Sequence, residues 1–316
     1  MNAVFLDWAT MGPDLDISRM RSLLPKLQIF DVTEPDQVAE RIRDAGYVLA
    51  NKIRLTDELL RDCPNLRFIG LTATGTDNVD LDAAKRHGIA VCNIRAYCSQ
   101  SVAEHVFACL LNLAHSLDRY VTDVRAGEWQ KSDDFCLLSH PVRELSAMTL
   151  GIVGYGELGR AVAGIAAAFK MNVLISARPG QPGSGDRIAF DELLARSDVI
   201  SLHCPLVAET RGLFGAAEFA RMKNTSILIN TARGGLIDSS ALADALRNGE
   251  IGAAAIDVLP QEPPVNGDPL LDYDGGNLLV TPHIAWATDR ARQAAIDELT
   301  ENIAAFQFGR KRNRLV

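Results

Sequence analysis

The sequence predicts an α/β protein with two parallel sheets. Short apolar runs of strand length alternate with helix-like stretches along most of the 316 residues, a pattern typical of βαβ units. The alternation is interrupted once, by a long apolar helix-like stretch at 101–117 and a polar stretch at 123–144. Because the pattern occurs on both sides of this interruption, we expect an inner domain at 100–284, inserted into an outer domain of residues 1–99 plus 285–316.

Each predicted strand is a short run rich in Val, Ile, Leu, Phe or Ala between polar or glycine-containing segments. Those before residue 100 are 3–6, 28–30, 47–50, 68–71 and 90–92, with amphipathic stretches at 36–45 and 81–87. Those after it are 149–153, 173–175, 199–202, 227–230, 253–257 and 278–280, with helices at 157–170, 239–248 and 289–308.

Composition and charge exclude several classes of partner. The net charge is -8, whereas nucleic-acid binding needs clustered Lys and Arg. The one dense basic run is the tail with Arg310, Lys311, Arg312 and Arg314, which we interpret as the solvated end of the terminal helix. The longest nearly apolar stretch, 158–169, falls short of the ~18 residues of a membrane span. We therefore expect neither a nucleic-acid nor a membrane partner.

The cysteines and the first residues indicate a cytoplasmic protein. The six cysteines form no Cys-x-x-Cys pair and no close Cys/His cluster, so we predict reduced thiols and no metal site. The N-terminus has no basic start followed by a long apolar core, which a signal peptide would show.

The strongest local motif is Gly154-Tyr155-Gly156-Glu157-Leu158-Gly159, which follows a predicted strand and opens a helix. In this context the first glycine allows the tight turn, the second lets the backbone approach a pyrophosphate, and the third allows close packing of helix on strand. The helix N-terminus adds unpaired N–H groups and a partial positive charge. The alternative is an ordinary glycine turn in a βα unit.

Arg178 bears on which dinucleotide binds. The second strand of such a unit usually ends in an acid that holds the ribose of NAD. Here the chain reads Val173-Leu174-Ile175-Ser176-Ala177-Arg178, with no acid. Because an arginine pairs with a 2′-phosphate, we favour NADP(H) over NAD(H). The alternative is an exposed loop arginine without a ligand.

Three more segments follow predicted strands, at the edge where ligands bind in open α/β sheets. They are Thr231-Ala232-Arg233-Gly234-Gly235, then Asp257 to Pro264, then Thr281-Pro282-His283-Ile284-Ala285-Trp286-Ala287-Thr288. Together with the glycine motif, this set resembles the D-isomer-specific 2-hydroxyacid dehydrogenases. The segments 73–80, 101–105 and 203–206 resemble the family too, so the resemblance covers nearly the whole chain.

The resemblance implies a Rossmann-type doubly wound cofactor domain inserted into a smaller flavodoxin-like α/β substrate domain. It also implies an NAD(P)-dependent oxidoreductase that reduces a small 2-oxo acid to the D-2-hydroxy acid and catalyses the reverse. Residues 4–7, 51–52 and 283–288 are most similar to glycerate dehydrogenases and hydroxypyruvate or glyoxylate reductases.

The resemblance assigns three catalytic residues. His283 would be the acid/base, because reduction of a carbonyl needs a proton on its oxygen near neutral pH. Glu262 would bind the far ring nitrogen and orient the imidazole. Arg233 would clamp the substrate carboxylate with its planar fork. Singly, each has a plain alternative: an inter-domain ion pair for Arg233, a loop acid for Glu262, and a cap of the last helix for His283.

Further residues follow from the same resemblance. The cofactor set comprises the glycine motif, Arg178, Cys204, Pro205, Thr231, Ala232, Arg233, Asp257 and His283, and a structural role is a close alternative for Asp257. The substrate set comprises Lys52, Thr74, Gly75, Arg233, His283 and Trp286, around a cleft between domains that closes to exclude water. Trp286 could equally be a core or interface residue.

The long helix 101–117 and the polar arm after it resemble the family's dimer interface, so we predict a homodimer. An alternative of another class is a corepressor-like protein that senses the nucleotide and binds protein partners on the same fold.

Overall fold

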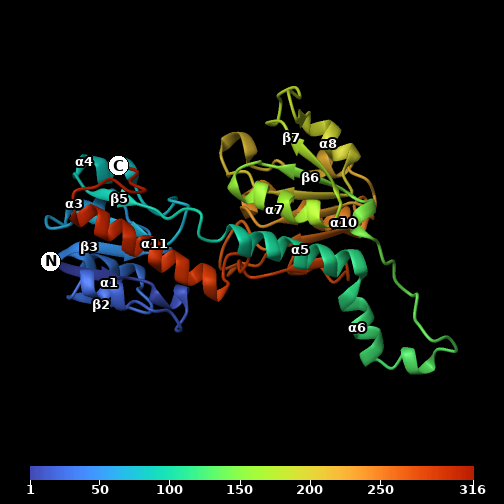
Figure 1. Cartoon of the computed structure of the whole chain (residues 1–316), viewed down its shortest axis with the longest axis horizontal. Helices are drawn as coiled ribbons and strands as arrows, with labels where there is room; N and C mark the ends of the chain where they lie inside the picture. Colours follow the sequence, from blue (N-terminus) through green and yellow to red (C-terminus); the bar gives the residue numbers. More distant parts are fainter. The chain divides into compact units, whose positions relative to one another are not determined.

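The computed structural model describes residues 1–316, which divide into two compact units. Unit 1 comprises Met1–Cys98 and Ala287–Val316, and unit 2 comprises Ser99–Trp286. Each unit is built on one parallel sheet with helices on its faces (Figure 1). The prediction of two parallel α/β sheets is therefore confirmed.

Unit 1 holds a five-stranded sheet. Its strands are β1 (Asn2–Phe5), β2 (Leu27–Ile29), β3 (Ala45–Ala50), β4 (Phe68–Leu71) and β5 (Ala90–Cys92). They lie in the order β2-β1-β3-β4-β5, and every pair is parallel. This is the flavodoxin-like order, so the predicted fold of the outer domain is confirmed.

Helices cover both faces of this sheet. They are α1 (Ser18–Leu23), α2 (Val38–Ile42), α3 (Asp57–Arg61), α4 (Leu81–Arg86) and α11 (Asp289–Gln307), with 3-10 turns at Trp8–Met11 and Pro35–Gln37. One core lies between the sheet and α2, α3 and α4. On the other face, Phe306 of α11 contacts Tyr47 and Phe68, with ring centroids 5.9 and 5.0 Å away. The second face of the sheet is therefore completed by the end of the chain.

Unit 2 holds a seven-stranded sheet. Its strands are β6 (Thr149–Val153), β7 (Asn172–Ser176), β8 (Arg187–Ile188), β9 (Val199–Leu202), β10 (Ile227–Asn230), β11 (Ala253–Ile256) and β12 (Leu278–Val280). The order is β12-β11-β10-β9-β6-β7-β8, all parallel. Counted from β6, this is the Rossmann order with one added strand, and it predicts ligand binding at the carboxyl ends of the strands.

Two hydrophobic cores hold this sheet between helices. The helices are α5 (Ser99–His115), α6 (Leu117–Arg125), α7 (Glu157–Ala168), α8 (Phe190–Arg196), α9 (Ala216–Phe219) and α10 (Ser239–Arg247). Short 3-10 turns lie at Trp129–Lys131, Leu145–Ala147, Ala208–Thr210 and Gly234–Leu236. One core joins the sheet to α5 and α7, and the other joins it to α8, α9 and α10. Because both faces are covered, the central strands β6, β9, β10 and β11 are mostly apolar.

Helix α5 ends earlier than predicted. Ser116 has a left-handed backbone (φ 52°), and a separate helix, α6, begins at Leu117. No residue of α6 is buried, and α6 and the segment 126–144 extend away from the sheet of unit 2 (Figure 1). The apolar side chains of α6, Leu117, Val121 and Val124, are exposed rather than packed on the sheet, and the predicted helix 101–117 did not extend over this segment.

Three of the four basic residues of the tail, Arg310, Lys311 and Arg314, are exposed as expected, but the tail is not the end of the terminal helix. Helix α11 ends at Gln307, and the chain returns to the sheet, where Leu315 N–H donates to the Val91 carbonyl over 2.8 Å. Arg312 pairs with Glu298 and is partly buried rather than solvated. The helix predicted at 36–45 is also shorter, because Ala45 already begins β3. None of the helices is both long and apolar enough to cross a bilayer.

Candidate active site

The glycine motif forms a tight turn between β6 and α7. Gly154 has a φ of +98°, and a Cβ there would lie 2.5 Å from the backbone of His203 and Cys204. A Cβ at Gly159 would overlap the carbonyl oxygen of Gly154. Beside Gly156, by contrast, a Cβ would meet nothing within 4 Å. Two glycines are therefore needed to close the turn, and the third leaves open space above it.

That open space lies at the N-terminus of α7, where first-turn N–H groups have no intrahelical partner. Gly156 and Glu157 are exposed, whereas Tyr155 packs against the core. Glu157 accepts a hydrogen bond from the Ser99 hydroxyl. Exposed backbone donors next to an open surface fit a pyrophosphate, so these residues could hold a dinucleotide.

Arg178 lies two residues beyond the end of β7, with an exposed side chain that forms no ion pair. No acid occupies the strand end. A second guanidinium reaches the same place, because Arg187 of β8 donates from Nη1 to the Ser176 carbonyl over 3.2 Å. Local sequence gave no sign of Arg187 here, since its position depends on the pairing of β8 with β7.

The residues that follow β9 pack against the glycine turn. The N–H of His203 donates to the Val153 carbonyl over 2.7 Å, and its Nε2 lies 2.8 Å from the Ser201 hydroxyl. Its Nδ1 is buried without a partner, and burial lowers the pKa of His203 to about 4. The ring is therefore neutral at neutral pH. Cys204 is half-buried, and burial raises its pKa, while Pro205 is exposed.

The loop after β10 carries Arg233. Asn230, fully buried at the strand end, accepts from the Ala232 N–H and donates to the Arg233 carbonyl, both over 3.0 Å. A Cβ at Gly234 would overlap the Leu259 backbone, so this loop lies directly against the next one. Asn230 was not predicted, although a polar residue closing a buried strand was a visible signal.

Arg233 itself is partly buried and has no carboxylate within 4.0 Å. Its Nη1 donates to the Ala232 carbonyl over 2.7 Å. Within unit 2, therefore, no acid neutralises its charge. A half-buried guanidinium without a counterion can bind an anionic ligand. Next to it, the hydroxyl of Thr231 is buried without a hydrogen-bond partner and could serve a bound ligand.

Glu262 and His283 lie in contact. Glu262 Oε2 is 2.6 Å from His283 Nδ1, and the side chains are 34% and 29% exposed. The other carboxylate oxygen accepts from the Leu259 N–H over 2.9 Å, which fixes the acid as well as the ring. The pair borders a cavity of about 430 Å³ whose wall is mostly apolar. With Nδ1 engaged, Nε2 remains for a proton transfer.

Asp257 shapes the loop that carries His283. Its carboxylate is 1% exposed and accepts from the N–H groups of Ile284 and Ala285, both over 2.9 Å, and from the Thr281 hydroxyl over 2.6 Å. His105 lies 3.7 Å from the same carboxylate. Asp257 thus has a structural role, and its contact with a nicotinamide stays a prediction.

The backbone of His283 is left-handed, with φ 56°. For a residue with a Cβ this costs about 1–2 kcal/mol, and such strain gathers at functional sites. The conformation is maintained because the His283 N–H donates to the Asp257 carbonyl over 2.8 Å. His283 does not cap the last helix, since the N-cap of α11 is Thr288.

Two turns of unit 1 lie at the carboxyl ends of its strands. After β3, the buried Asp7 carboxylate accepts from the N–H groups of Asn51 (2.9 Å) and Lys52 (2.6 Å); burial raises the pKa of Asp7. After β4, the N–H groups of Thr74 and Gly75 have no partner within the chain. Unpaired successive N–H groups are a typical anion-binding feature.

Fold and site together define a dinucleotide-binding protein with an acid–base pair and an uncompensated arginine at one edge of its sheet. Residues 107–285 match the family described as D-isomer specific 2-hydroxyacid dehydrogenase, NAD binding domain. The chain belongs to this family of oxidoreductases, so the predicted family, fold and enzyme class are confirmed.

Curated relatives agree with this assignment. The chain is 43% identical over 279 residues to a glycerate dehydrogenase from Methylorubrum extorquens, covering 88% of both chains. It is 37% identical over 317 residues to a hydroxypyruvate reductase from Blautia hydrogenotrophica, covering 98% of each. A solved D-lactate dehydrogenase from Aquifex aeolicus, with NAD and lactic acid, superposes with a TM-score of 0.82 at 31% identity, covering 98% of this chain and 96% of that one.

Proposed function

We propose that this enzyme reduces hydroxypyruvate or glyoxylate to the corresponding 2-hydroxy acid and catalyses the reverse reaction. The observation that carries the proposal is the 2.6 Å contact between Glu262 and His283, on the same sheet edge as the glycine turn. The relatives named glycerate dehydrogenase and hydroxypyruvate reductase support the substrate class.

In this reaction each group has one task. A bound reduced nicotinamide supplies the hydride to the carbonyl carbon. His283 donates a proton from Nε2 to the carbonyl oxygen, and Glu262 holds the imidazole through Nδ1. Arg233 binds the carboxylate and polarises the carbonyl, because its charge is not already neutralised by an acid.

Four further residues complete the proposed substrate site. Thr74 and Gly75 would donate their unpaired N–H groups to the substrate carboxylate. Lys52 is exposed beside a turn that Asp7 holds in place, and we retain it and Trp286 as residues lining the substrate pocket.

For the cofactor, the exposed turn around Gly156 would bind the pyrophosphate. Thr231, Ala232, Cys204 and Pro205 follow the neighbouring strands β10 and β9 and would contact the rest of the dinucleotide. We propose NADP(H) as the preferred form, because Arg178 is unpaired and Arg187 adds a second positive charge at a strand end without an acid.

We further propose a homodimer that forms through α6 and the arm 126–144. Large apolar side chains are exposed along both, including Val121 (45%), Trp129 (49%), Phe135 (90%) and Leu138 (84%). Apolar patches of this kind mark protein interfaces, and light scattering on the purified protein would report the mass. A cytoplasmic location fits the six free thiols.

The testing experiment is steady-state turnover of hydroxypyruvate, glyoxylate and pyruvate, each with NADPH and NADH. We expect the fastest reduction with hydroxypyruvate or glyoxylate and NADPH. Cofactor binding without turnover of any 2-oxo acid would contradict the proposal and favour a nucleotide-sensing, corepressor-like role instead.

A further inference from the structure

The turn that carries the unpaired N–H groups of Thr74 and Gly75 is hydrogen-bonded to the segment that follows β5. Asn93, which follows β5 and is 4% exposed, donates from Nδ2 to the Thr74 carbonyl over 2.8 Å. The N–H of Ile94 donates to the Ala73 carbonyl over 3.2 Å. The Thr74 hydroxyl donates to the Ile94 carbonyl over 3.0 Å.

These bonds determine where the free N–H groups point. A peptide unit is planar and trans, so its N–H points opposite to its carbonyl. The Ala73 carbonyl shares a plane with the Thr74 N–H, and the Thr74 carbonyl shares one with the Gly75 N–H. Because both carbonyls are bonded to the Asn93–Ile94 segment, both N–H groups face away from it.

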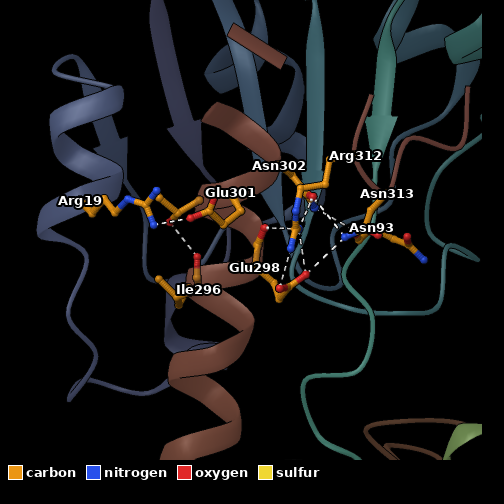
Figure 2. A network of polar contacts seen from close by, with 9 residues as sticks. Arg19, Asn93, Ile296, Glu298, Glu301, Asn302, Arg312 and Asn313 are labelled. Atoms are coloured by element: carbon orange, nitrogen blue, oxygen red, sulfur yellow. Dashed lines mark hydrogen bonds and ion pairs between the residues drawn. The ribbon is translucent and has the colours of Figure 1, made fainter. Parts of the chain in front are cut away.

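Asn93 depends in turn on a side chain from the last helix. Asn302 of α11 is 1% exposed, and its Nδ2 donates to the Asn93 carbonyl over 2.8 Å. Its Oδ1 accepts from Arg312 Nη1 over 2.9 Å and from Asn313 Nδ2 over 3.2 Å. Figure 2 shows Asn302 beside Arg312, Asn313 and Asn93.

The far end of this chain of bonds is a charged pair. Arg312 binds Glu298 through two contacts, Nη2–Oε1 at 2.7 Å and Nη1–Oε2 at 2.9 Å (Figure 2). The guanidinium lowers the pKa of Glu298, and the carboxylate raises the pKa of Arg312. The Asn313 carbonyl accepts from the Asn93 N–H over 3.3 Å, which closes the network on both sides of Asn93.

We infer that Asn302, Arg312 and Glu298 are positioning residues that aim the Thr74 and Gly75 N–H groups at the substrate carboxylate. The inference rests on the proposed function. None of the three side chains is assigned contact with substrate or cofactor; they act through Asn93 on two peptide planes. Carboxylate binding is equal in ground and transition states, so a loosened turn should raise KM more than it lowers kcat.

The chain offers a matched control on the same helix. Glu301 lies three residues after Glu298 and pairs with Arg19 over 2.5 Å, with side chains 41% and 62% exposed. Glu301 forms no hydrogen bond with Arg312, Asn302 or Asn93, and only its charge acts on Arg312; Figure 2 shows the two pairs on the same helix. Glu298→Gln and Glu301→Gln therefore remove the same charge from one helix, and only the first alters a side chain that is hydrogen-bonded to Arg312.

The experiment compares Asn302→Ala, Glu298→Gln and Glu301→Gln by steady-state kinetics with the 2-oxo acid that the wild type reduces fastest. We expect KM to rise about tenfold in Asn302→Ala and about threefold in Glu298→Gln, with kcat and the Kd for NADPH within twofold of wild type. Glu301→Gln should keep the wild-type KM. An unchanged KM in Asn302→Ala, or equal rises in the two glutamate variants, would overturn the inference.

Hydrogen exchange separates a failure of this inference from a failure of the proposed function. The Ile94 N–H bonds to Ala73, so its protection reports the held turn without turnover. If the wild type reduces none of the acids, the proposed function fails, and exchange at Ile94 decides the rest. Faster exchange of the Ile94 N–H in Asn302→Ala but not in Glu301→Gln would support the inference that Asn302 holds the turn in place. Unchanged exchange in both variants would refute it.

Discussion

Replacing Gly154 by alanine tests whether the glycine turn is fixed by the protein itself. The new Cβ would lie 2.5 Å from backbone atoms of His203 and Cys204, and ordinary contact begins at 3.4 Å. The two segments would have to separate by about 0.9 Å, which a close-packed interior resists. The φ of +98° adds backbone strain of about 1–2 kcal/mol, and overpacking adds about 1–3 kcal/mol.

Gly156→Ala is the matched comparison, because its Cβ meets nothing in the chain and its φ of −81° suits any residue. We expect Gly154→Ala to lower the free energy of unfolding by about 2–5 kcal/mol and Gly156→Ala to leave it within about 0.5 kcal/mol. Both should weaken NADPH at least about tenfold, the second because its methyl group occupies the space for the pyrophosphate.

Urea unfolding gives the first quantity, and fluorescence titration with NADPH gives the second. A Gly154→Ala protein as stable as Gly156→Ala would refute the steric reasoning. A Gly156→Ala protein that binds NADPH as the wild type does would show that the pyrophosphate lies elsewhere. Gly164→Ala, in the open part of α7, is the control and should gain up to about 1 kcal/mol in stability.

Three more predictions follow. Arg178→Ala should weaken NADPH far more than NADH, because only NADPH carries the 2′-phosphate; equal losses in titrations with the two cofactors would contradict that role. His283→Ala should abolish turnover at unchanged NADPH affinity, and near-normal rates would remove it from the mechanism. The half-buried His203, with its pKa lowered from 6.5 to about 4, binds a proton in the unfolded chain before it does so in the folded one. Its contribution is present above pH 6.5 and is lost as the pH falls towards 4, by up to about 3 kcal/mol. In His203→Gln, the free energy of unfolding measured with urea should change less between pH 6.5 and 4 than in the wild type. An unaltered dependence on pH would argue against this role of His203.

The strands could be predicted because they are buried on both faces. Residues 149–153, 199–202 and 227–230 coincide with β6, β9 and β10, since a covered parallel strand is an apolar run with polar ends. Helix α6 could not be predicted in this way, because none of its residues is buried. The edge strand β8 has two residues, too few to form a pattern.

Some residues of the candidate site could be predicted from the sequence and others could not. Arg233, Glu262 and His283 stand in continuous segments at strand ends, and the resemblance of these segments to the family was needed to predict their roles. Arg187 was missed because the pairing of two strands brings it to Ser176.

The contacts of the C-terminal tail could not be predicted either, because they also depend on tertiary structure. Arg312 reaches Asn302 and Glu298 only after the chain reverses beyond α11, and Asn302 then meets Asn93, 209 residues away. No local pattern in the sequence contains such contacts.

Because unit 2 is inserted into the sequence of unit 1, the order of synthesis determines which unit can fold first. The five strands of unit 1 are made by Cys92, but α11, which covers Phe68 on one face of their sheet, begins only at Asp289. At the usual rate of translation, this face of the sheet stays uncovered for roughly 10–40 s, until α11 has been synthesised.

Unit 2 faces no such delay. Its sequence is continuous, and near its two ends the Ser101 hydroxyl donates to the Ala285 carbonyl over 2.7 Å. The inserted unit can therefore fold as soon as it emerges, while its host keeps an apolar surface uncovered. We therefore expect nascent chains stalled before Asp289 to expose the apolar face of this sheet to chaperones.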